Sequence, residues 1–285
     1  MIKLLKYFTQ SIFVYTFFLV GRLIGLSLSR KFFSYIFIKI ASNFRSSKII
    51  EKNLDNFPIK MSRFERDKII KNMWKNYGMT FVEYIYLDFF RKNNSHIQIM
   101  GEKNLSIAIK RNKPVIFVSG HFANYELMSM EITKKDIKLA TIYRPLNNYF
   151  INPLMEFLRK RYVCKNQIKK GVKGVREAIE YLNKQYSIAL MIDQRVSEGE
   201  KINFFNKPAF TTTLPAQLAL KYDLSIIPVY IERINDNYFK IEFLDEIKAA
   251  DYKNKIVLSE KLNDVLEKMI LRNPNQWIWT HNRWK

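Results

Sequence analysis

The sequence predicts an α/β fold with a mixed, mostly parallel sheet flanked by helices. Short apolar, β-rich runs alternate with segments of helical periodicity, which is the order that builds a mostly parallel sheet. The run at 115–119 is apolar almost throughout, as in a strand buried on both faces. Asn235, Asp236 and Asn237 separate the last two β-rich runs and predict a hairpin there.

The expected elements follow one another along most of the chain. A connector at 43–60 holds a short helix that ends before Pro58, and a loop is expected at 198–210. Strands are expected at 97–100, 115–119, 138–143, 187–192, 226–231 and 238–243. Helices are expected at 62–90, 101–111, 126–132, 152–162, 172–184, 214–222 and 256–271.

Composition limits the class of protein and its partners. The chain has 285 residues, of which 48% are hydrophobic, so it can build a sizeable core. Its net charge of +22 suggests a negatively charged partner, namely nucleic acid, an anionic membrane, an acidic protein or a phosphorylated substrate. No zinc finger, RNA-recognition or helix-turn-helix pattern is readable, so we expect no nucleic acid. The single Cys164 excludes an internal disulfide, and the histidines are too scattered for a zinc site.

Residues 1–42 are predicted to be a hydrophobic membrane-anchoring segment, and residues 43–285 the functional domain. The apolar run at 7–29 follows Lys3 and Lys6 and is interrupted by Arg22. It reaches the roughly 20 residues of a spanning helix only if Arg22 is included, so a pair of interfacial helices fits equally well. A signal peptide is disfavoured because no clear cleavage site follows. A buried pair of helices is the remaining alternative.

A candidate general base lies directly after the strand at 115–119. Gly120 ends the strand, His121 follows, and Glu126 stands where the next helix begins. If Glu126 leans back from the first helical turn, it can hold Nδ1–H of His121 and leave Nε2 free to accept a proton. A substrate hydroxyl activated in this way could attack an acyl carbonyl. The alternative is a capping histidine beside an exposed glutamate.

Polar residues also follow two other predicted strands. Arg144 ends the run at 138–143, and Asp193 and Gln194 follow the run at 187–192. Open α/β sheets bind ligands outside the carboxyl ends of their strands. If these strands are parallel, His121, Arg144 and Asp193 lie at one edge of the sheet, and this convergence predicts a site there.

Three of the four tryptophans lie near the end of the chain, within PNQWIWTHNRWK. Tryptophans beside arginine and lysine suit a membrane interface. Packing against the core is an equal alternative for Trp277 and Trp279.

Several motifs in their order along the chain resemble the late acyltransferases of lipid A biosynthesis. They are NLDNFP, MGEKNL, GHFANYEL with its His-x4-Glu pattern, YRP, the Asp-Gln pair after a strand, FFNKPA and the closing PNQWIWTHNRWK. The resemblance covers roughly residues 43–285 and includes a hydrophobic N-terminus. It implies the glycerolipid-acyltransferase fold, a mixed sheet flanked by helices.

The resemblance also implies an activity and its partners. An acyl chain moves from acyl carrier protein, or from acyl-CoA, to a hydroxyl of a lipid A precursor, with no cofactor. The partners are then the acidic carrier protein and an anionic membrane lipid. The enzyme is expected at the bacterial inner membrane with its catalytic domain on the cytoplasmic face. A lysophospholipid or another glycolipid is the alternative acceptor.

The matching positions suggest roles for individual residues. His121 matches the family's general base, Glu126 its orienting carboxylate and Asp193 a second acidic residue that assists. Arg144, together with Arg159 or Arg161, matches basic positions that bind phosphate or steady an oxyanion. Gln194, beside Asp193, is expected to bind substrate. The sequence departs from the family pattern at Ala123 and Asn206, where glycine is usual, and at Tyr125, where tryptophan is usual.

Overall fold

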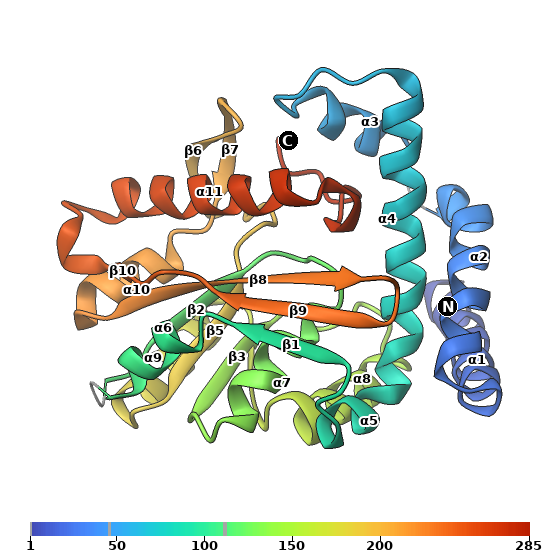
Figure 1. Ribbon diagram of the computed structural model, residues 1–285, viewed down its shortest axis with the longest axis horizontal. Helices are drawn as coiled ribbons and strands as arrows, with labels where there is room; N and C mark the ends of the chain where they lie inside the picture. Colours follow the sequence, from blue (N-terminus) through green and yellow to red (C-terminus); the bar gives the residue numbers. More distant parts are fainter. Residues whose placement is uncertain (1, 45–46, 111–112) are drawn as a thin grey trace.

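An eight-stranded sheet forms the centre of the computed structural model, which describes residues 2–44, 47–110 and 113–285 (Figure 1). Strand β8 pairs antiparallel with β9 and β10, and the other neighbouring strands are parallel. The predicted mixed, mostly parallel sheet is therefore confirmed. Across the sheet the strands are β1 (Ile97–Met100), β9 (Tyr238–Phe243), β8 (Ser225–Ile234), β2 (Ile116–Ser119), β5 (Ser187–Met191), β3 (Leu139–Tyr143) and β4 (Asn166–Lys169), with β10 (Ile247–Lys248) beside β8.

The register of the central strands fixes where the site can be. Strand β2 lies between β5 and β8, and β3 lies on the far side of β5. Ser119 is paired with Met191, and Ile142 with Leu190, so β2, β3 and β5 end at the same edge of the sheet. Helix α4 (Arg63–Glu83) lies across the end of the sheet to which β8 points (Figure 1).

Helices cover both faces of the sheet, and β2 shows why its run is apolar throughout. Ile116 and Val118 belong to the core that includes α9 (Val172–Asn183), α10 (Leu214–Tyr222) and α11 (Lys255–Arg272). Phe117 belongs to the opposite core, which includes α5 (Leu87–Lys92), α6 (Glu102–Lys110), α7 (Glu126–Lys134) and α8 (Asn152–Leu158). Because successive side chains of a strand point to opposite faces, both sets must be apolar.

The N-terminal part consists of helices α1 (Ile2–Ile24), α2 (Leu26–Phe44) and α3 (Ser47–Asp55), which precede α4. Helix α2 packs directly on α4: a Cβ atom at Gly78 would lie 2.4 Å from the carbonyl oxygen of Phe33. Ser62 and Glu65 form a capping box that starts α4. The helix predicted at 62–90 is divided by a 3-10 turn at Tyr84–Tyr86, after which α5 begins.

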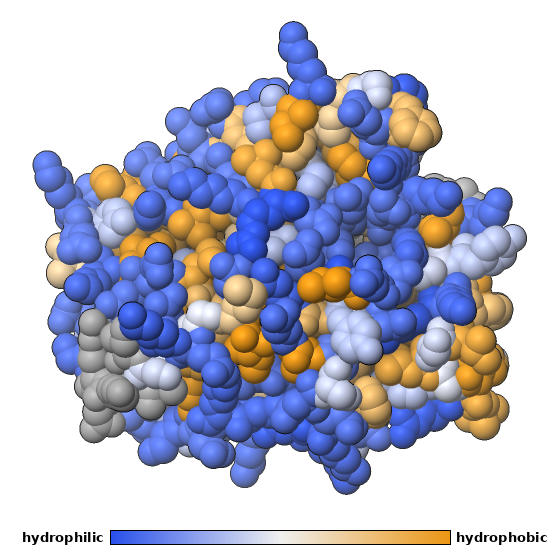
Figure 2. All heavy atoms as spheres, viewed as in Figure 1, coloured by the Kyte–Doolittle hydropathy of each residue, from blue (hydrophilic) through white to orange (hydrophobic). Residues whose placement is uncertain are grey.

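Helix α1 leaves most of its apolar side chains exposed. In the described part of the chain it is the helix that is long and apolar enough to cross a membrane. Only 17% of its most apolar 18-residue stretch is buried inside the protein. Apolar side chains gather on the edge of the molecule that α1 and α2 form (Figures 1 and 2). The exposed large side chains of α1 are Ile2, Leu4, Leu5, Phe8, Ile12, Phe13, Tyr15, Leu19, Leu23 and Ile24.

The structure also differs from the sequence expectations outside α4. The loop predicted at 198–210 is wrong, because β6 (Glu200–Phe204) and β7 (Lys207–Thr211) form an antiparallel hairpin. Its turn residues have positive φ, 50° at Phe205 and 58° at Asn206, a conformation that glycine adopts most readily. Strand β4 was not expected. Trp277 and Trp279 are 1% and 0% exposed, so the membrane-interface interpretation is wrong for these two.

Candidate active site

The turn that carries His121 connects β2 to α7. After β2 ends at Ser119, the chain turns through residues 120–125, and Ala123 adopts the left-handed conformation with φ of 43°. Glycine adopts this conformation more readily than alanine does. The turn is held from the C-terminal segment, because the Ala123 N–H donates to the Gln276 carbonyl over 3.2 Å and Phe122 forms a β-bridge with Trp277.

The structure pairs His121 with Asp193. Nδ1 of His121 lies 2.7 Å from Oδ1 of Asp193, and the backbone N–H of His121 donates to Oδ2 over 2.9 Å. The indole N–H of Trp277 donates to the same Oδ2 over 2.9 Å. Burial opposes ionisation of Asp193, but His121 and these hydrogen bonds lower its pKa to about 2. An ionised Asp193 requires Nδ1 to carry the proton, which leaves Nε2 of His121 as an acceptor.

Glu126 does not hold His121, and this part of the sequence prediction is wrong. Its Oε1 accepts from Nε of Arg159 over 2.8 Å and from Nη2 over 2.6 Å. It also accepts a short hydrogen bond from the hydroxyl of Tyr84. Glu126 begins α7 as predicted, but it points to the arginine. The carboxylate that orients His121 comes from the end of β5, 72 residues away along the chain.

The Glu126–Arg159 pair is nearly buried, with side chains 9% and 11% exposed. Arg159 follows α8 and also donates to the Tyr84 hydroxyl over 2.8 Å. Burial opposes its charge, but Glu126 raises the pKa of Arg159 above its ordinary value, so the guanidinium stays charged. The sequence left Arg159 and Arg161 as alternatives, and the structure places Arg159 in the site. Arg161 is exposed and lies over the rings of Phe157 and Tyr162.

An open cavity of about 490 Å³ lies at this edge of the sheet. It is lined by five of the six predicted site residues, and Asp193 lies buried behind His121. The five lining residues are His121, Glu126, Arg144, Arg159 and Gln194. The structure therefore brings the residues that follow these strands together at one edge of the sheet, as predicted.

The cavity has further lining residues that the sequence did not indicate. Lys170 follows β4; burial, and then the charge of Arg144, lower its pKa, so two cations lie close together on this wall. His281 accepts the backbone N–H of Arg195 at Nε2 over 2.9 Å, and burial lowers the pKa of its imidazole. The proton of the neutral ring is then on Nδ1. The sequence also did not indicate two residues behind the lining, namely Tyr84, which contacts Glu126 and Arg159, and Trp277, which donates to Asp193. The aromatic tail was the available signal for Trp277.

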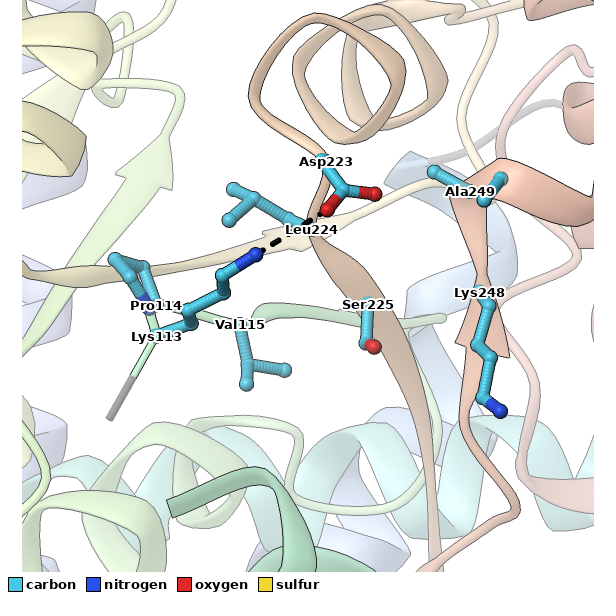
Figure 3. Close-up of a pocket in the computed structure, with 9 residues that line it drawn as sticks. Lys113, Pro114, Val115, Asp223, Leu224, Ser225, Lys248 and Ala249 are labelled. Carbon is cyan, nitrogen blue, oxygen red and sulfur yellow. Dashed lines mark hydrogen bonds and ion pairs between the residues drawn. The ribbon is translucent and has the colours of Figure 1, made fainter. Parts of the chain in front are cut away.

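A second cavity lies at the opposite edge of the sheet and lacks such chemistry (Figure 3). It has a volume of about 170 Å³ and is lined where β2 and β8 begin. Its one drawn polar contact joins Nζ of Lys113 to Oδ2 of Asp223 over 3.2 Å, and both side chains are largely exposed. The cavity beside His121 is therefore the better candidate for an active site.

Known proteins resemble this chain over most of its length. The family model for bacterial lipid A biosynthesis acyltransferases matches residues 1–285. The chain is 28% identical to the lipid A biosynthesis palmitoleoyltransferase of Escherichia coli, over 85% of this chain and 79% of the relative. It is 24% identical to the lipid A biosynthesis lauroyltransferase of the same organism, over 87% of this chain and 82% of the relative.

The chain is also similar to a solved structure. That structure is the 1-acyl-sn-glycerophosphate acyltransferase PlsC of Thermotoga maritima, at 14% sequence identity and a TM-score of 0.43. The match covers 89% of this chain and 96% of that one.

Proposed function

Because the chain belongs to the bacterial lipid A biosynthesis acyltransferases, we propose that it moves a fatty acyl chain from acyl carrier protein, or from acyl-CoA, to a hydroxyl of a lipid A precursor. The acyl donor is a co-substrate, and the reaction needs no cofactor. The observation that carries the proposal is the His121–Asp193 pair at the wall of a cavity that also holds Arg144 and Arg159.

In the proposed mechanism His121 is the general base. Its Nε2 takes the proton of the acceptor hydroxyl, and the hydroxyl oxygen attacks the thioester carbonyl carbon. Asp193 stabilises the imidazolium that forms, since its carboxylate is already bonded to Nδ1. When the tetrahedral intermediate collapses, the carbon–sulfur bond breaks and the departing thiolate takes the proton from Nε2. The new ester bond forms directly, without an acyl-enzyme.

The oxyanion of that intermediate needs hydrogen-bond donors. The backbone N–H groups of Phe122 and Ala123 are already engaged, because they donate to the carbonyls of Gly120 and Gln276 respectively. A charged arginine can supply such a donor, and Arg159 lines the cavity. The neutral His281, which carries its proton on Nδ1, lines the same cavity and could donate beside it.

Arg144 and Lys170 suit the phosphate groups of a lipid A precursor, because paired cations bind phosphate oxygens through charge-assisted hydrogen bonds. Gln194 lines the same cavity as an uncharged donor and acceptor. The acidic carrier protein would be steered by the net positive charge of the chain.

Replacing Arg144 by glutamine should raise KM for a phosphorylated acceptor about tenfold and leave kcat within about twofold, because one charge-assisted contact is lost. Steady-state kinetics with phosphorylated and dephosphorylated acceptors measure the difference. Arg161→Gln is the matched control, since Arg161 is a nearby cation outside the cavity lining. If both substitutions changed KM equally, Arg144 would not be a phosphate-binding residue.

Replacing Glu126 by glutamine should lower kcat by roughly tenfold or more and also lower the melting temperature. The change leaves the nearly buried Arg159 without its carboxylate, and an uncompensated buried charge is destabilising. Product formation and thermal unfolding check both parts. An unchanged kcat would show that the Glu126–Arg159 pair is dispensable for transfer.

The apolar N-terminus supports a location of the reaction at a membrane. Helix α1 exposes a large apolar face, and Lys3 lies near the ring of Tyr7, as in aromatic and basic anchors at a membrane surface. We propose that the enzyme works at the bacterial inner membrane with its catalytic domain on the cytoplasmic face, where acyl carrier protein is available.

A panel of donors and acceptors tests the proposal. The full chain in detergent is given acyl carrier protein or coenzyme A donors together with a tetra-acylated lipid A precursor or a lysophospholipid, and products are read by mass. A mass gain of one acyl chain on the lipid A precursor is the expected result. Acylation of lysophospholipid alone would keep the chemistry and replace the substrate. No transfer to either acceptor would overturn the proposed function.

A further inference from the structure

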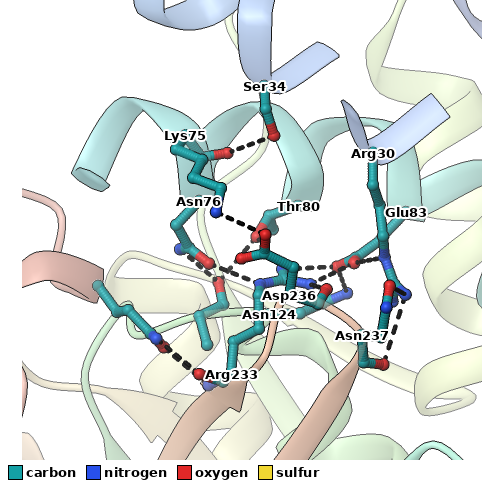
Figure 4. A network of polar contacts seen from close by, with 12 residues as sticks. Arg30, Ser34, Lys75, Asn76, Thr80, Glu83, Asn124, Arg233, Asp236 and Asn237 are labelled. Atoms are coloured by element: carbon teal, nitrogen blue, oxygen red, sulfur yellow. Dashed lines mark hydrogen bonds and ion pairs between the residues drawn. The ribbon is translucent and has the colours of Figure 1, made fainter. Parts of the chain in front are cut away.

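A buried carboxylate in α4 is surrounded by two arginines from distant parts of the chain (Figure 4). Glu83 is 0% exposed; its Oε1 accepts from Nε of Arg30 over 2.6 Å, and its Oε2 accepts from Nη2 of Arg233 over 2.9 Å. Arg30 lies on α2 and Arg233 on β8. Burial opposes ionisation of Glu83, but Arg233 and Arg30 lower its pKa below the ordinary value. The three charges therefore persist inside the protein.

The same carboxylate contacts the turn that carries His121. Nδ2 of Asn124 donates to Oε2 of Glu83 over 2.9 Å, and Asn124 is 1% exposed. Asn124 lies three residues after His121 and two before Glu126. Glu83 thus bonds directly to the short segment that connects the proposed base to the carboxylate at the start of α7.

Arg233 extends these contacts to the neighbouring residue of the turn. Its Nη2 donates to the hydroxyl of Thr80 over 3.2 Å, and that hydroxyl donates to the carbonyl of Ala123 over 2.9 Å. Ala123 holds the left-handed conformation, which a residue with a side chain keeps only when its surroundings fix it. The turn is therefore fixed both at the Ala123 backbone and at the Asn124 side chain.

We propose that Glu83 and Arg30 are positioning residues that couple the seating of helix α2 to the geometry of the catalytic turn. Arg30, on helix α2, donates to the carboxylate of Glu83, and the same carboxylate accepts from Asn124 in the turn. The position of α2 thereby restricts the position of the turn. Neither residue lines the cavity, so neither touches substrate. The inference depends on the proposed function only where acyl transfer is used as a readout.

Among the described residues, helices α1 and α2 form two ion pairs with the rest of the protein, and we expect the coupling from only one of them. Arg22 of α1 also reaches across, to Asp88 over 2.9 Å and to the carbonyl of Ile85 over 3.0 Å. Its side chain is 50% exposed, and neither of these contacts involves the turn. Arg22→Met is therefore the matched control for Arg30→Met.

The test compares Arg30→Met, Arg30→Lys and Arg22→Met in the full chain in detergent. Glu83→Gln is avoided because it would leave two buried guanidiniums without a carboxylate. Arg30→Met should lower kcat about ten- to a hundredfold with KM within about twofold, since a small displacement of a catalytic group costs this much. Arg30→Lys should restore a substantial part of kcat, and Arg22→Met should leave kcat within about twofold.

A second readout does not require turnover. Carbethoxylation of His121 by diethyl pyrocarbonate, followed by peptide mass analysis, reports how firmly the ring is held. The rate should rise severalfold in Arg30→Met and stay unchanged in Arg22→Met. Asn124→Ala, which keeps all three charges, should reproduce the faster labelling.

The values of kcat and of the labelling rate in these variants decide whether Arg30 and Glu83 position the turn. If Arg30→Met and Arg22→Met have the same kcat and the same labelling rate at His121, the coupling is wrong, whatever their melting temperatures. If the wild type transfers no acyl chain to any acceptor, the proposed function fails, and the labelling comparison alone still tests the coupling.

Discussion

Replacing His121 by alanine should lower kcat by about 10²–10⁴, the usual contribution of a general base. The side chain is 17% exposed at the wall of the cavity, and its Nε2 is left as an acceptor by the bond from Nδ1 to Asp193. Removing the ring should leave the fold intact, because the turn is also held by the backbone contacts of Phe122 and Ala123. Initial rates of product formation measure the loss.

The melting temperature of His121→Ala, compared with that of the wild type, is the control for folding. The ring covers a buried carboxylate, so a shift of a few degrees is compatible with the proposed role. Near-normal turnover in a variant that melts as the wild type does would contradict a general base at this position.

Replacing Asp193 by asparagine should be nearly as severe, with kcat again lower by about 10²–10⁴. The backbone N–H of His121 and the indole N–H of Trp277 both donate to Oδ2 of Asp193. In the asparagine variant these two donors should hold the amide oxygen at the position of Oδ2. The amide NH₂ then faces Nδ1, which must become an acceptor. The proton moves to Nε2, and the base is blocked although the shape of the site is kept.

Comparison with Glu126→Gln shows which of the two carboxylates supports His121. Asp193 contacts His121 and Glu126 contacts Arg159, so we expect the larger loss of kcat from Asp193→Asn. A mild effect of Asp193→Asn together with a severe effect of Glu126→Gln would mean that the carboxylate of the His-x4-Glu motif, and not Asp193, supports the base during the reaction.

Much of the fold and the position of the site follow from local sequence patterns. The apolar run at 115–119 could be recognised as a buried strand because β2 has apolar contacts on both faces. Polar residues after three such runs located the site, because parallel strands bring their carboxyl ends together. This argument needs only the parallel direction of the strands, which the helical crossovers between the runs favour.

The pairing within the site could not be predicted in the same way. The sequence suggested Glu126 as the partner of His121, because Glu126 begins the next helix and could lean back toward the histidine before it. The pairing of His121 with Asp193 depends on the register of β2 against β5. The pairing of Glu126 with Arg159 depends on where α8 ends. Such contacts between distant segments leave no periodic signal in the chain.

The hairpin of β6 and β7 was missed for a local reason. Two positive φ values at Phe205 and Asn206 make its turn, and neither position holds glycine, the residue that most clearly marks such turns. The buried charges of Glu83, Arg30 and Arg233 were equally hidden, because charged residues in a sequence are ordinarily expected at the surface.

Mass analysis of lipid and protein together tests the central claim most directly. Wild type and His121→Ala are incubated side by side with acyl carrier protein donor, first alone and then with a tetra-acylated lipid A precursor. We expect no acyl adduct on the protein with donor alone, and a gain of one acyl chain on the precursor with the wild type only. An acyl-protein adduct, or an equal gain of mass with His121→Ala, would contradict direct transfer by a base at His121.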